Sequence, residues 1–326
     1  MVFMSSGGSL MAIYQEVFWS KFQEACGVAV KSYELANRSL SQMETLIDSG
    51  DVPFDLFTTF NGQRYPQLIE AGLLEKLPAD IWTGLDGRII AGAYSDYGVW
   101  AAPYATLMIY STQAFPGGLH SWQDFWDVET YPGPRILQDS PTNIVFALLS
   151  TGMATDEVYP ITKEKVKLAF ERLDALRPQL RNFWKTGDQP IQGVGSGEFV
   201  AGTAWNGRAT VGRREGLPIG ISWEGNLLST SWFVVARGAA HPRAAAAAIR
   251  FLQNPEVQAG LARKTGYAGP VIGLQDYVDP EVYANLPSNP ENVARASVQD
   301  SAWWAENEAW LAAAWSKWVA TGRYED

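Results

Sequence analysis

Apolar residues in the first part of the chain recur with two different periods. Val2 to Met4 forms a short apolar run that predicts a buried strand. From about Leu10 to Ala25 the apolar residues recur every three or four positions, which predicts an amphipathic helix; they are Met11, Tyr14, Val17, Phe18 and Phe22. Strands at Val28–Tyr33 and Phe54–Phe57, with a helix between them from about Ser39 to Ser49, continue the alternation. This order is typical of a parallel sheet in an α/β fold.

The same two periods recur through the rest of the chain, without an internal repeat or a low-complexity linker. Predicted strands lie at 106–110, 135–137, 200–205, 217–223 and 230–236. Predicted helices cover 65–71, 144–149, 163–176, 242–253 and 301–320. With 326 residues the chain is long enough for two domains of ordinary size.

Polar side chains gather where one predicted strand ends. Val200 to Trp205 is the strand, and Asn206-Gly207 follows as a predicted turn, since both residues tolerate a positive φ. Arg208 comes next, so an indole, an amide and a guanidinium adjoin the strand end, where open α/β sheets bind ligands. The alternative is a hairpin with a core tryptophan.

Two small-residue loops follow strands near the start of the chain. Ser5-Ser6-Gly7-Gly8-Ser9 leads into the first predicted helix, and Thr58 to Gly62 follows the third strand. The backbone N–H groups of a helix N-terminus, together with small hydroxyls, suit an anion or a polar ligand. Neither loop has the G-x-G-x-x-G or the G-K-[ST] pattern of a phosphate-binding loop.

Composition excludes several classes of function. The net charge of −10 argues against a nucleic-acid partner, which normally requires a basic patch. The longest apolar runs, such as Trp232 to Ala236, are too short to span a bilayer. One cysteine, Cys26, allows no intrachain disulfide, and with two histidines a zinc site is not expected; carboxylates would still suit a hard cation. We therefore expect no metal and no cofactor.

Catalytic motifs are missing from the sequence. There is no G-x-S-x-G motif, and the two histidines, His120 and His241, lie in predicted loops without nearby partners. We expect no catalytic residue and no enzyme, although an enzyme and a protein-interaction module remain as alternatives to a binding protein.

Several segments resemble the solute-binding proteins of ABC importers. One runs from His241-Pro242-Arg243-Ala244 through Arg250-Phe251-Leu252-Gln253-Asn254-Pro255 to Thr265-Gly266-Tyr267. Others resemble the spermidine/putrescine-binding branch, and they are Phe54-Asp55-Leu56, Ile69 to Leu74, Pro103-Tyr104, Ser121-Trp122 and Trp205-Asn206-Gly207. The similarity covers nearly the whole chain in order.

The resemblance implies the type II periplasmic-binding-protein fold, in which two α/β lobes close like a hinged clamp on a ligand between them. Lobe 1 would comprise 1–107 and 236–290, and lobe 2 would comprise 108–235 and 291–326. Two crossing segments are expected, near 106–110 and 230–236. The protein would be a periplasmic monomer that delivers a small-molecule ligand to the transmembrane subunits of an ABC permease. Val2-Phe3-Met4 follows Met1 without an export signal, so either the signal was removed or the protein is cytosolic.

The sequence departs from the polyamine-binding branch at positions that contact ligand there. Matching the neighbouring residues places Pro141, Ile144 and Thr230 where that branch has acidic residues, and Arg208 where it often has a small one. A polycation would meet a like charge, so we expect a small organic anion such as a carboxylate, with a polyamine as the alternative. The expected ligand-binding residues are Ser6, Gly8, Ser9, Phe60, Asn61, Tyr104, Thr142, Trp205, Asn206, Arg208, Thr230 and Trp232. For Trp232 a core position is an equal alternative, and for Arg208 a solvent-facing one stays open.

Overall fold

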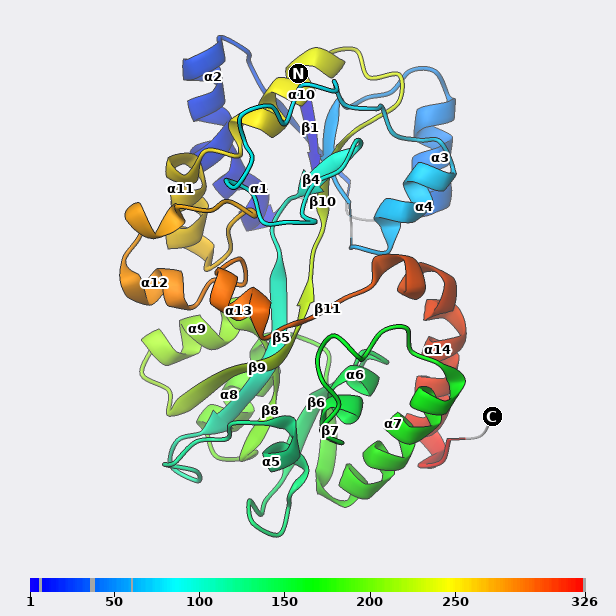
Figure 1. Cartoon of the computed structure of the whole chain (residues 1–326), viewed down its shortest axis with the longest axis vertical. Coiled ribbons are helices and arrows are strands. Elements are labelled where there is room, and N and C mark those ends of the chain that lie inside the picture. Colours follow the sequence, from blue (N-terminus) through cyan, green and yellow to red (C-terminus); the bar gives the residue numbers. More distant parts are fainter. Residues whose placement is uncertain (6–7, 36–38, 60, 325–326) are drawn as a thin grey trace. The chain divides into compact units, whose positions relative to one another are not determined.

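The computed structural model describes residues 1–5, 8–35, 39–59 and 61–324, so the predicted site residues Ser6 and Phe60 lie outside the described residues. The chain divides into two compact units. Unit 1 comprises 1–103 and 229–290, and unit 2 comprises 104–228 and 291–326 (Figure 1). The fold is the mixed α/β architecture with two sheets that the sequence predicted.

The boundaries between the units differ from the predicted ones. Residues 104–107 belong to unit 2, because Thr106 and Leu107 pair with its strand at 201–205. Residues 229–235 belong to unit 1, because Phe233 and Val235 pair with its strand at 56–58. The chain passes between the units after Pro103, Leu228 and Pro290. The clamp motion stays a prediction.

Unit 1 is built on a five-stranded sheet with the order β2-β1-β3-β10-β4. The strands β1 (Val2–Ser5), β2 (Lys31–Glu34) and β3 (Leu56–Thr58) are parallel, as predicted. Strand β10 (Trp232–Val235) runs antiparallel between β3 and β4 (Gly98–Trp100). The first residue of β10 therefore lies at the same edge of the sheet as the last residues of β3 and β4.

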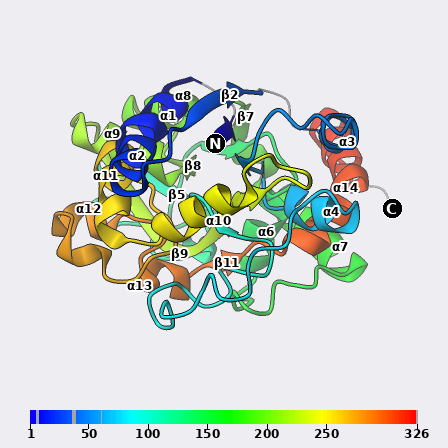
Figure 2. The same cartoon turned by 90° about the horizontal axis from the view of Figure 1, so that it is seen from above.

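Helices cover both faces of this sheet. Successive strand residues point to opposite sides, and the apolar side chains on both sides are buried under these helices. Phe3, Leu56 and Phe233 belong to the apolar cluster on the side of α1, α10 and α11. Met4, Phe57 and Val234 point to the other face and are also buried, and α3 and α4 lie on that side in Figure 1. Figure 2 shows α11 alongside α1. The bounds are α1 (Gly8–Tyr14), α2 (Ser20–Cys26), α3 (Leu40–Asp48), α4 (Arg64–Glu70), α10 (Pro242–Phe251), α11 (Pro255–Thr265), α12 (Pro280–Ala284) and α13 (Pro290–Ala294).

The helix predicted from Leu10 to Ala25 begins earlier and is not uniform. It starts at Gly8 and contains a π-helical turn at Gln15–Trp19 between α1 and α2. Apolar spacing does not distinguish this turn from α-helix, since its residues Val17, Phe18 and Trp19 are all buried as an amphipathic helix requires. Gly27 ends α2 with a φ of 68°, the left-handed conformation in which glycine commonly terminates a helix.

Unit 2 is built on a six-stranded sheet with the order β11-β9-β5-β8-β6-β7. Strands β6 and β7 are parallel, and so are β6 and β8, whereas β5 is antiparallel to β8. The carboxyl ends of three neighbouring strands therefore meet at one edge. The bounds are β5 (Tyr104–Ser111), β6 (Arg135–Gln138), β7 (Leu180–Trp184), β8 (Ala201–Trp205), β9 (Ile219–Ser229) and β11 (Ser297–Val298).

Both faces of this sheet are buried as well. Leu107, Ile136 and Ala204 belong to the apolar cluster that includes α8 (Asp188–Gly195) and α9 (Asn206–Arg214). Met108 and Leu137 belong to the cluster on the other side, which the remaining helices complete (Figure 1). Those helices are α5 (Trp122–Trp126), α6 (Asn143–Leu149), α7 (Lys163–Leu176) and α14 (Ser301–Thr321).

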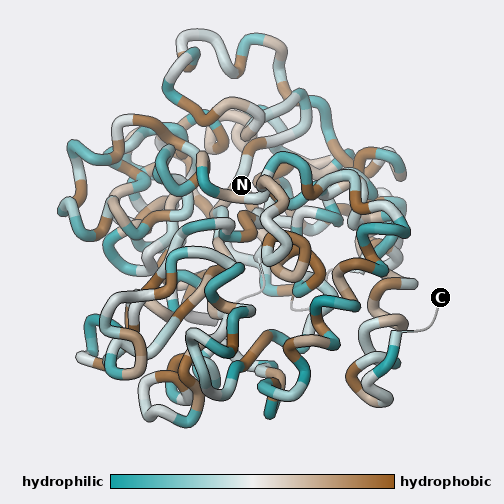
Figure 3. The backbone as a smooth tube through the Cα atoms, turned by 60° about the horizontal axis from the view of Figure 1, so that its bottom comes forward, coloured by the Kyte–Doolittle hydropathy of each residue, from teal (hydrophilic) through white to brown (hydrophobic). Residues whose placement is uncertain are grey.

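The tryptophans of α14 pack mainly against unit 2. Trp304, Trp315 and Trp318 are almost fully buried, whereas Trp310 is 39% exposed. Figure 3 shows that hydrophobic segments of the helices are short and interrupted by polar ones. Among the described residues no helix combines the length and the apolar character needed to cross a membrane.

Candidate functional site

The carboxyl ends of β6, β7 and β8 place three different side chains in one row. In the β6–β7 register Gln138 pairs with Trp184, so Asp139 lies beside Lys185. Strand β8 is the neighbour of β6 on the other side and ends at Trp205. A carboxylate, an ammonium group and an indole therefore lie at or just beyond the ends of three neighbouring strands.

Trp205 is held by packing on two sides while part of it stays accessible. Its ring meets the Trp184 ring edge-on, with centroids 5.1 Å apart and planes at 87°. Trp184 is fully buried, and its Nε1 donates to Thr203 Oγ1 at 3.1 Å. On another side the indole lies against Gly187, where an added Cβ would be 2.9 Å from Trp205 Cε3. The aromatic surface at this strand end is therefore fixed in orientation.

Arg208 lies in the first turn of α9, and its side chain is 56% exposed. Its Nη1 is 3.4 Å from Oδ1 of Asp188, the first residue of α8, and the Asp188 side chain is 71% exposed. Its Cγ packs near the same glycine, Gly187, 3.1 Å from where a Cβ would be. Because exposed ion pairs contribute only about 0–1 kcal/mol, Asp188 orients the guanidinium without blocking an incoming anion.

The turn predicted at Asn206-Gly207 is wrong, because α9 begins at Asn206 directly after β8. Gly207 is helical and has no positive φ. The Asn206 side chain is fully buried, and its Oδ1 accepts a hydrogen bond from the N–H of Ala105 at 3.0 Å. This contact ties α9 to β5 next to Tyr104, which is partly exposed. Asn206 thus holds the site together, and its Oδ1 is engaged by the backbone.

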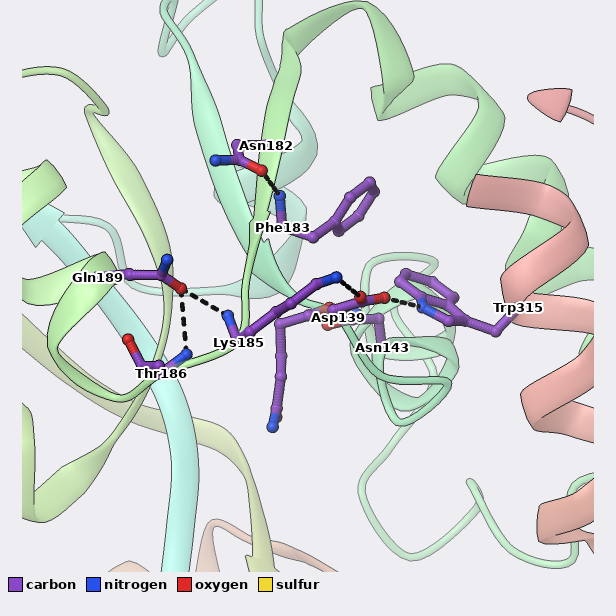
Figure 4. Close-up of polar contacts among 9 residues, drawn as sticks. Asp139, Asn143, Asn182, Phe183, Lys185, Thr186, Gln189 and Trp315 are labelled. Carbon is purple, nitrogen blue, oxygen red and sulfur yellow. Dashed lines mark hydrogen bonds and ion pairs between the residues drawn. The ribbon is translucent and has the colours of Figure 1, made fainter. Parts of the chain in front are cut away.

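The turn from β7 to α8 carries both Lys185 and Asp188. Gln189 Oε1 accepts hydrogen bonds from the N–H groups of Lys185 at 2.6 Å and Thr186 at 3.1 Å, which fixes this turn (Figure 4). The turn therefore positions two charged side chains together with Gly187, on which Trp205 and Arg208 pack. It is the element that connects the two ion pairs of this edge.

Asp139 is gripped from two sides, as Figure 4 shows. Its Oδ1 accepts a hydrogen bond from Trp315 Nε1 at 2.9 Å, and its Oδ2 is 3.3 Å from Lys185 Nζ. Close by, the Nδ2 of Asn143 donates to the carbonyls of Gln138 at 2.7 Å and Ser140 at 2.8 Å. The predicted residue Thr142 is partly buried, and its Oγ1 is 2.8 Å from Ser140 Oγ.

The corresponding edge of unit 1 is largely aromatic. Trp232 is 8% exposed and stacks on Tyr65 of α4, with centroids 3.8 Å apart and planes at 4°. Its backbone N–H donates to Thr59 Oγ1 at 2.9 Å, while its indole Nε1 is buried without a partner among the described residues. Burial raises the pKa of Tyr65 to about 12. The structure thus places Trp232 in unit 1, mostly within the packing, whereas the predicted boundaries assign it to lobe 2.

The other predicted residues of unit 1 serve the backbone. Asn61 Oδ1 accepts the N–H of Arg64, the first residue of α4, at 3.0 Å. The Oγ1 of Thr230, which is buried, donates to the carbonyl of Ser231 at 2.8 Å. Gly8 and Ser9 form the start of α1, after the carboxyl end of β1. Within the described residues, no three His, Cys, Asp or Glu side chains gather as metal ligands would.

The sequence reasoning missed Asp139, Lys185, Asp188 and Gly187. Two of these follow strand ends directly, Asp139 after Gln138 of β6 and Lys185 after Trp184 of β7. A charged residue just beyond a strand was the available signal. For Lys185 this signal is hidden, because the pattern of 180–184 does not predict a strand. For Asp139 the signal is present, since the strand at 135–137 is predicted.

A family model described as a bacterial extracellular solute-binding protein matches residues 19–291. The match covers most of the chain, and the chain belongs to this family. It is therefore the substrate-binding protein of an ABC importer and a transport protein, not an enzyme.

Named relatives agree with this assignment. The gamma-aminobutyric acid-binding protein of Pseudomonas aeruginosa is 28% identical, over 97% of this chain and 90% of that protein. The spermidine/putrescine-binding periplasmic protein of Escherichia coli is 28% identical, over 80% of this chain and 76% of that protein. The solved Atu4243-GABA receptor is 25% identical with a TM-score of 0.84, covering 100% of this chain and 99% of that one.

Proposed function

We propose that this substrate-binding protein captures a small organic molecule with a carboxylate group at the sheet edge of unit 2. The observation that carries the proposal is Arg208, whose half-exposed guanidinium follows the strand end at Trp205 in the first turn of α9. A guanidinium binds a carboxylate through two parallel hydrogen bonds, and the helix N-terminus adds a favourable electrostatic field.

The relatives narrow the class of ligand. A protein named for binding gamma-aminobutyric acid (GABA) matches nearly the whole chain. GABA carries a carboxylate at one end and an ammonium group at the other, so it includes the anionic group that Arg208 suits. The proposed ligand is a small amino carboxylate of this kind, which the protein delivers to the permease of its importer.

A polyamine is the second candidate, because spermidine/putrescine-binding proteins are also relatives. The carboxylates of Asp139 and Asp188 lie on the same edge, but each faces a cation of the protein, Lys185 and Arg208 respectively. A polyamine offers nothing for the guanidinium to bind. The amino carboxylate leaves fewer charges without a partner.

A thermal-shift screen with GABA, butyrate, putrescine and spermidine separates the two candidates. A ligand that binds only the folded chain adds about 2.7 kcal/mol at one hundred times its Kd. For a chain of this size that raises the Tm by several degrees, at about 2–4 °C per kcal/mol. GABA is expected to raise the Tm. A rise with putrescine and spermidine, and none with GABA or butyrate, overturns the carboxylate proposal.

A further inference from the structure

Asp139 follows β6, the middle one of the three strands that end at the unit 2 edge. Its carboxylate is bonded to α14, which covers the face of the sheet opposite to α8 and α9. Trp315 of α14, 3% exposed, donates its Nε1 to Oδ1 of Asp139. The carboxylate is itself 30% exposed, and Oδ2 is the oxygen that faces Lys185. The carboxylate therefore keeps its position whether or not Lys185 remains beside it.

The ammonium group of Lys185 is bound only weakly to Oδ2 of Asp139. Its Nζ is 3.3 Å from Oδ2, and its side chain is 75% exposed. A flexible, exposed lysine loses little free energy when it leaves such a pair, about 0–1 kcal/mol. A second ammonium group arriving at the same oxygen can replace it, because Lys185 is then hydrated at the surface.

A buried acceptor beside Asp139 adds to the preference for a cation. Asn143 is fully buried, and its Nδ2 binds the carbonyls on either side of Asp139. Its Oδ1 has no hydrogen-bond donor in the described part of the chain. Figure 4 shows Asn143 beside Asp139. An unpaired buried acceptor next to a carboxylate makes the local potential more negative, which favours a cation there.

The indole of Trp205 lies at the same edge of the sheet. Trp205 is the last residue of β8, the strand next to β6, and Trp184 and Gly187 fix the orientation of its indole. An aromatic face at the edge that carries a carboxylate favours an ammonium group, through cation–π attraction. Three features of the edge thus favour the same chemistry.

We propose that Asp139 is an ammonium subsite, and that the ammonium group of Lys185 occupies it until a ligand's ammonium group displaces it. The proposal rests on the proposed function only in that the same ligand places its carboxylate on Arg208. Lys185 then determines selectivity. A ligand with an ammonium group alone competes with a tethered cation, whereas one that also binds Arg208 has a second anchor.

The experiment measures binding of three probes by calorimetry: GABA, butyrate with the carboxylate alone, and butylamine with the ammonium group alone. Variants are Lys185→Met, which removes the competing cation, and Asp139→Asn, which removes the charge of the subsite. Lys167→Met is the matched control, since Lys167 is an exposed lysine of α7 in the same unit. Circular dichroism and the Tm verify that each variant folds.

Lys185→Met is expected to bind GABA and butylamine about two- to fivefold more tightly, because the tethered competitor is gone. Asp139→Asn is expected to bind both at least tenfold more weakly, and butyrate affinity is expected to stay unchanged in both variants. Weaker GABA binding by Lys185→Met, or equal changes for GABA and butyrate, overturns the subsite. So does the failure of butylamine to bind Lys185→Met.

The design separates this proposal from the proposed function. If butyrate binds neither wild type nor variants while butylamine follows the expected order, the carboxylate assignment fails and the subsite stands. If butyrate binds and Arg208→Ala abolishes its binding, but butylamine affinity is the same in wild type, Asp139→Asn and Lys185→Met, the subsite fails and the carboxylate assignment stands. Lys167→Met matching wild type is required in either case.

Discussion

Gly187 has no room for a side chain, because a Cβ added there would be only 2.9 Å from the Cε3 atom of the Trp205 indole. Arg208 Cγ is 3.1 Å from the same point. The backbone of Gly187 has a φ of −62° and a ψ of −17°, which any residue adopts. The glycine is therefore required for space and not for its backbone freedom. Two proposed ligand-binding residues, Trp205 and Arg208, pack against it.

Gly187→Ala is accordingly expected to displace Trp205 and Arg208 while the chain still folds. Overpacking by one methyl group costs about 1–3 kcal/mol, and part of this appears as weaker ligand binding, about tenfold. Calorimetry with GABA and the Tm measure the two parts. Gly117→Ala is the control, because a Cβ there meets nothing within 4 Å. Equal GABA affinity in Gly187→Ala and Gly117→Ala would show that the packing of Trp205 and Arg208 on Gly187 does not affect binding.

Arg208→Ala is expected to weaken binding of the carboxylate ligand by roughly 30- to several-thousand-fold, corresponding to about 2–5 kcal/mol. Arg208→Lys is expected to bind poorly too, since an ammonium group lacks the planar fork of guanidinium. The Tm is expected to change little, because the side chain is 56% exposed and makes one exposed ion pair. Unchanged affinity in both variants, measured by calorimetry with GABA, removes the support for a carboxylate at this position.

Arg135 offers a test of stability away from the ligand. Its guanidinium is fully buried and donates to the carbonyls of Phe125, Tyr131 and Gly133. Burial lowers its pKa to about 10. Arg135→Met leaves three carbonyls without donors, which costs about 3–5 kcal/mol in total, or roughly 10 °C of Tm. Scanning calorimetry measures this loss, and a Tm within two or three degrees of wild type would contradict it.

The pKa of Tyr65 predicts a change of stability in alkaline solution. Burial raises that pKa from 10.0 to about 12, so the folded chain favours the neutral phenol. The resulting stabilisation is complete below pH 10 and is lost as the pH rises from 10 to about 12, because the unfolded chain ionises first. Denaturant unfolding at pH 9 and pH 11 measures the loss. Tyr65→Phe, which cannot ionise, is expected to lose less stability over this interval.

The parallel core of each unit was predictable from the sequence, because strands buried on both faces are nearly continuous apolar runs. Val2 to Met4 and Leu56 to Phe57 are of this kind. Strand β7 was not, since Arg181 and Asn182 face solvent at the edge of the sheet and interrupt the pattern. Because this strand could not be predicted, Lys185 and Asp188, which lie just beyond its end, could not be assigned to a strand end.

Trp205 and Arg208 were found because a strand end is visible in the sequence, but their surroundings were not. Asn206 and Gly207 have the composition of a turn, yet Asn206 binds the backbone of Ala105, 101 residues earlier. Local preference favoured the turn, and this distant contact, together with burial of Gly207, favours the helix. The partners Asp188 and Trp315 depend equally on contacts that no local pattern encodes.

Trp315, which holds Asp139, lies 176 residues after it in the chain. During synthesis the strands β6, β7 and β8 therefore leave the ribosome well before the helix that fixes their central carboxylate. Asp139 gains this hydrogen bond only after α14 (Ser301–Thr321) has docked on the sheet. The ammonium subsite proposed at Asp139 is therefore complete only when the C-terminal helix of the chain is in place.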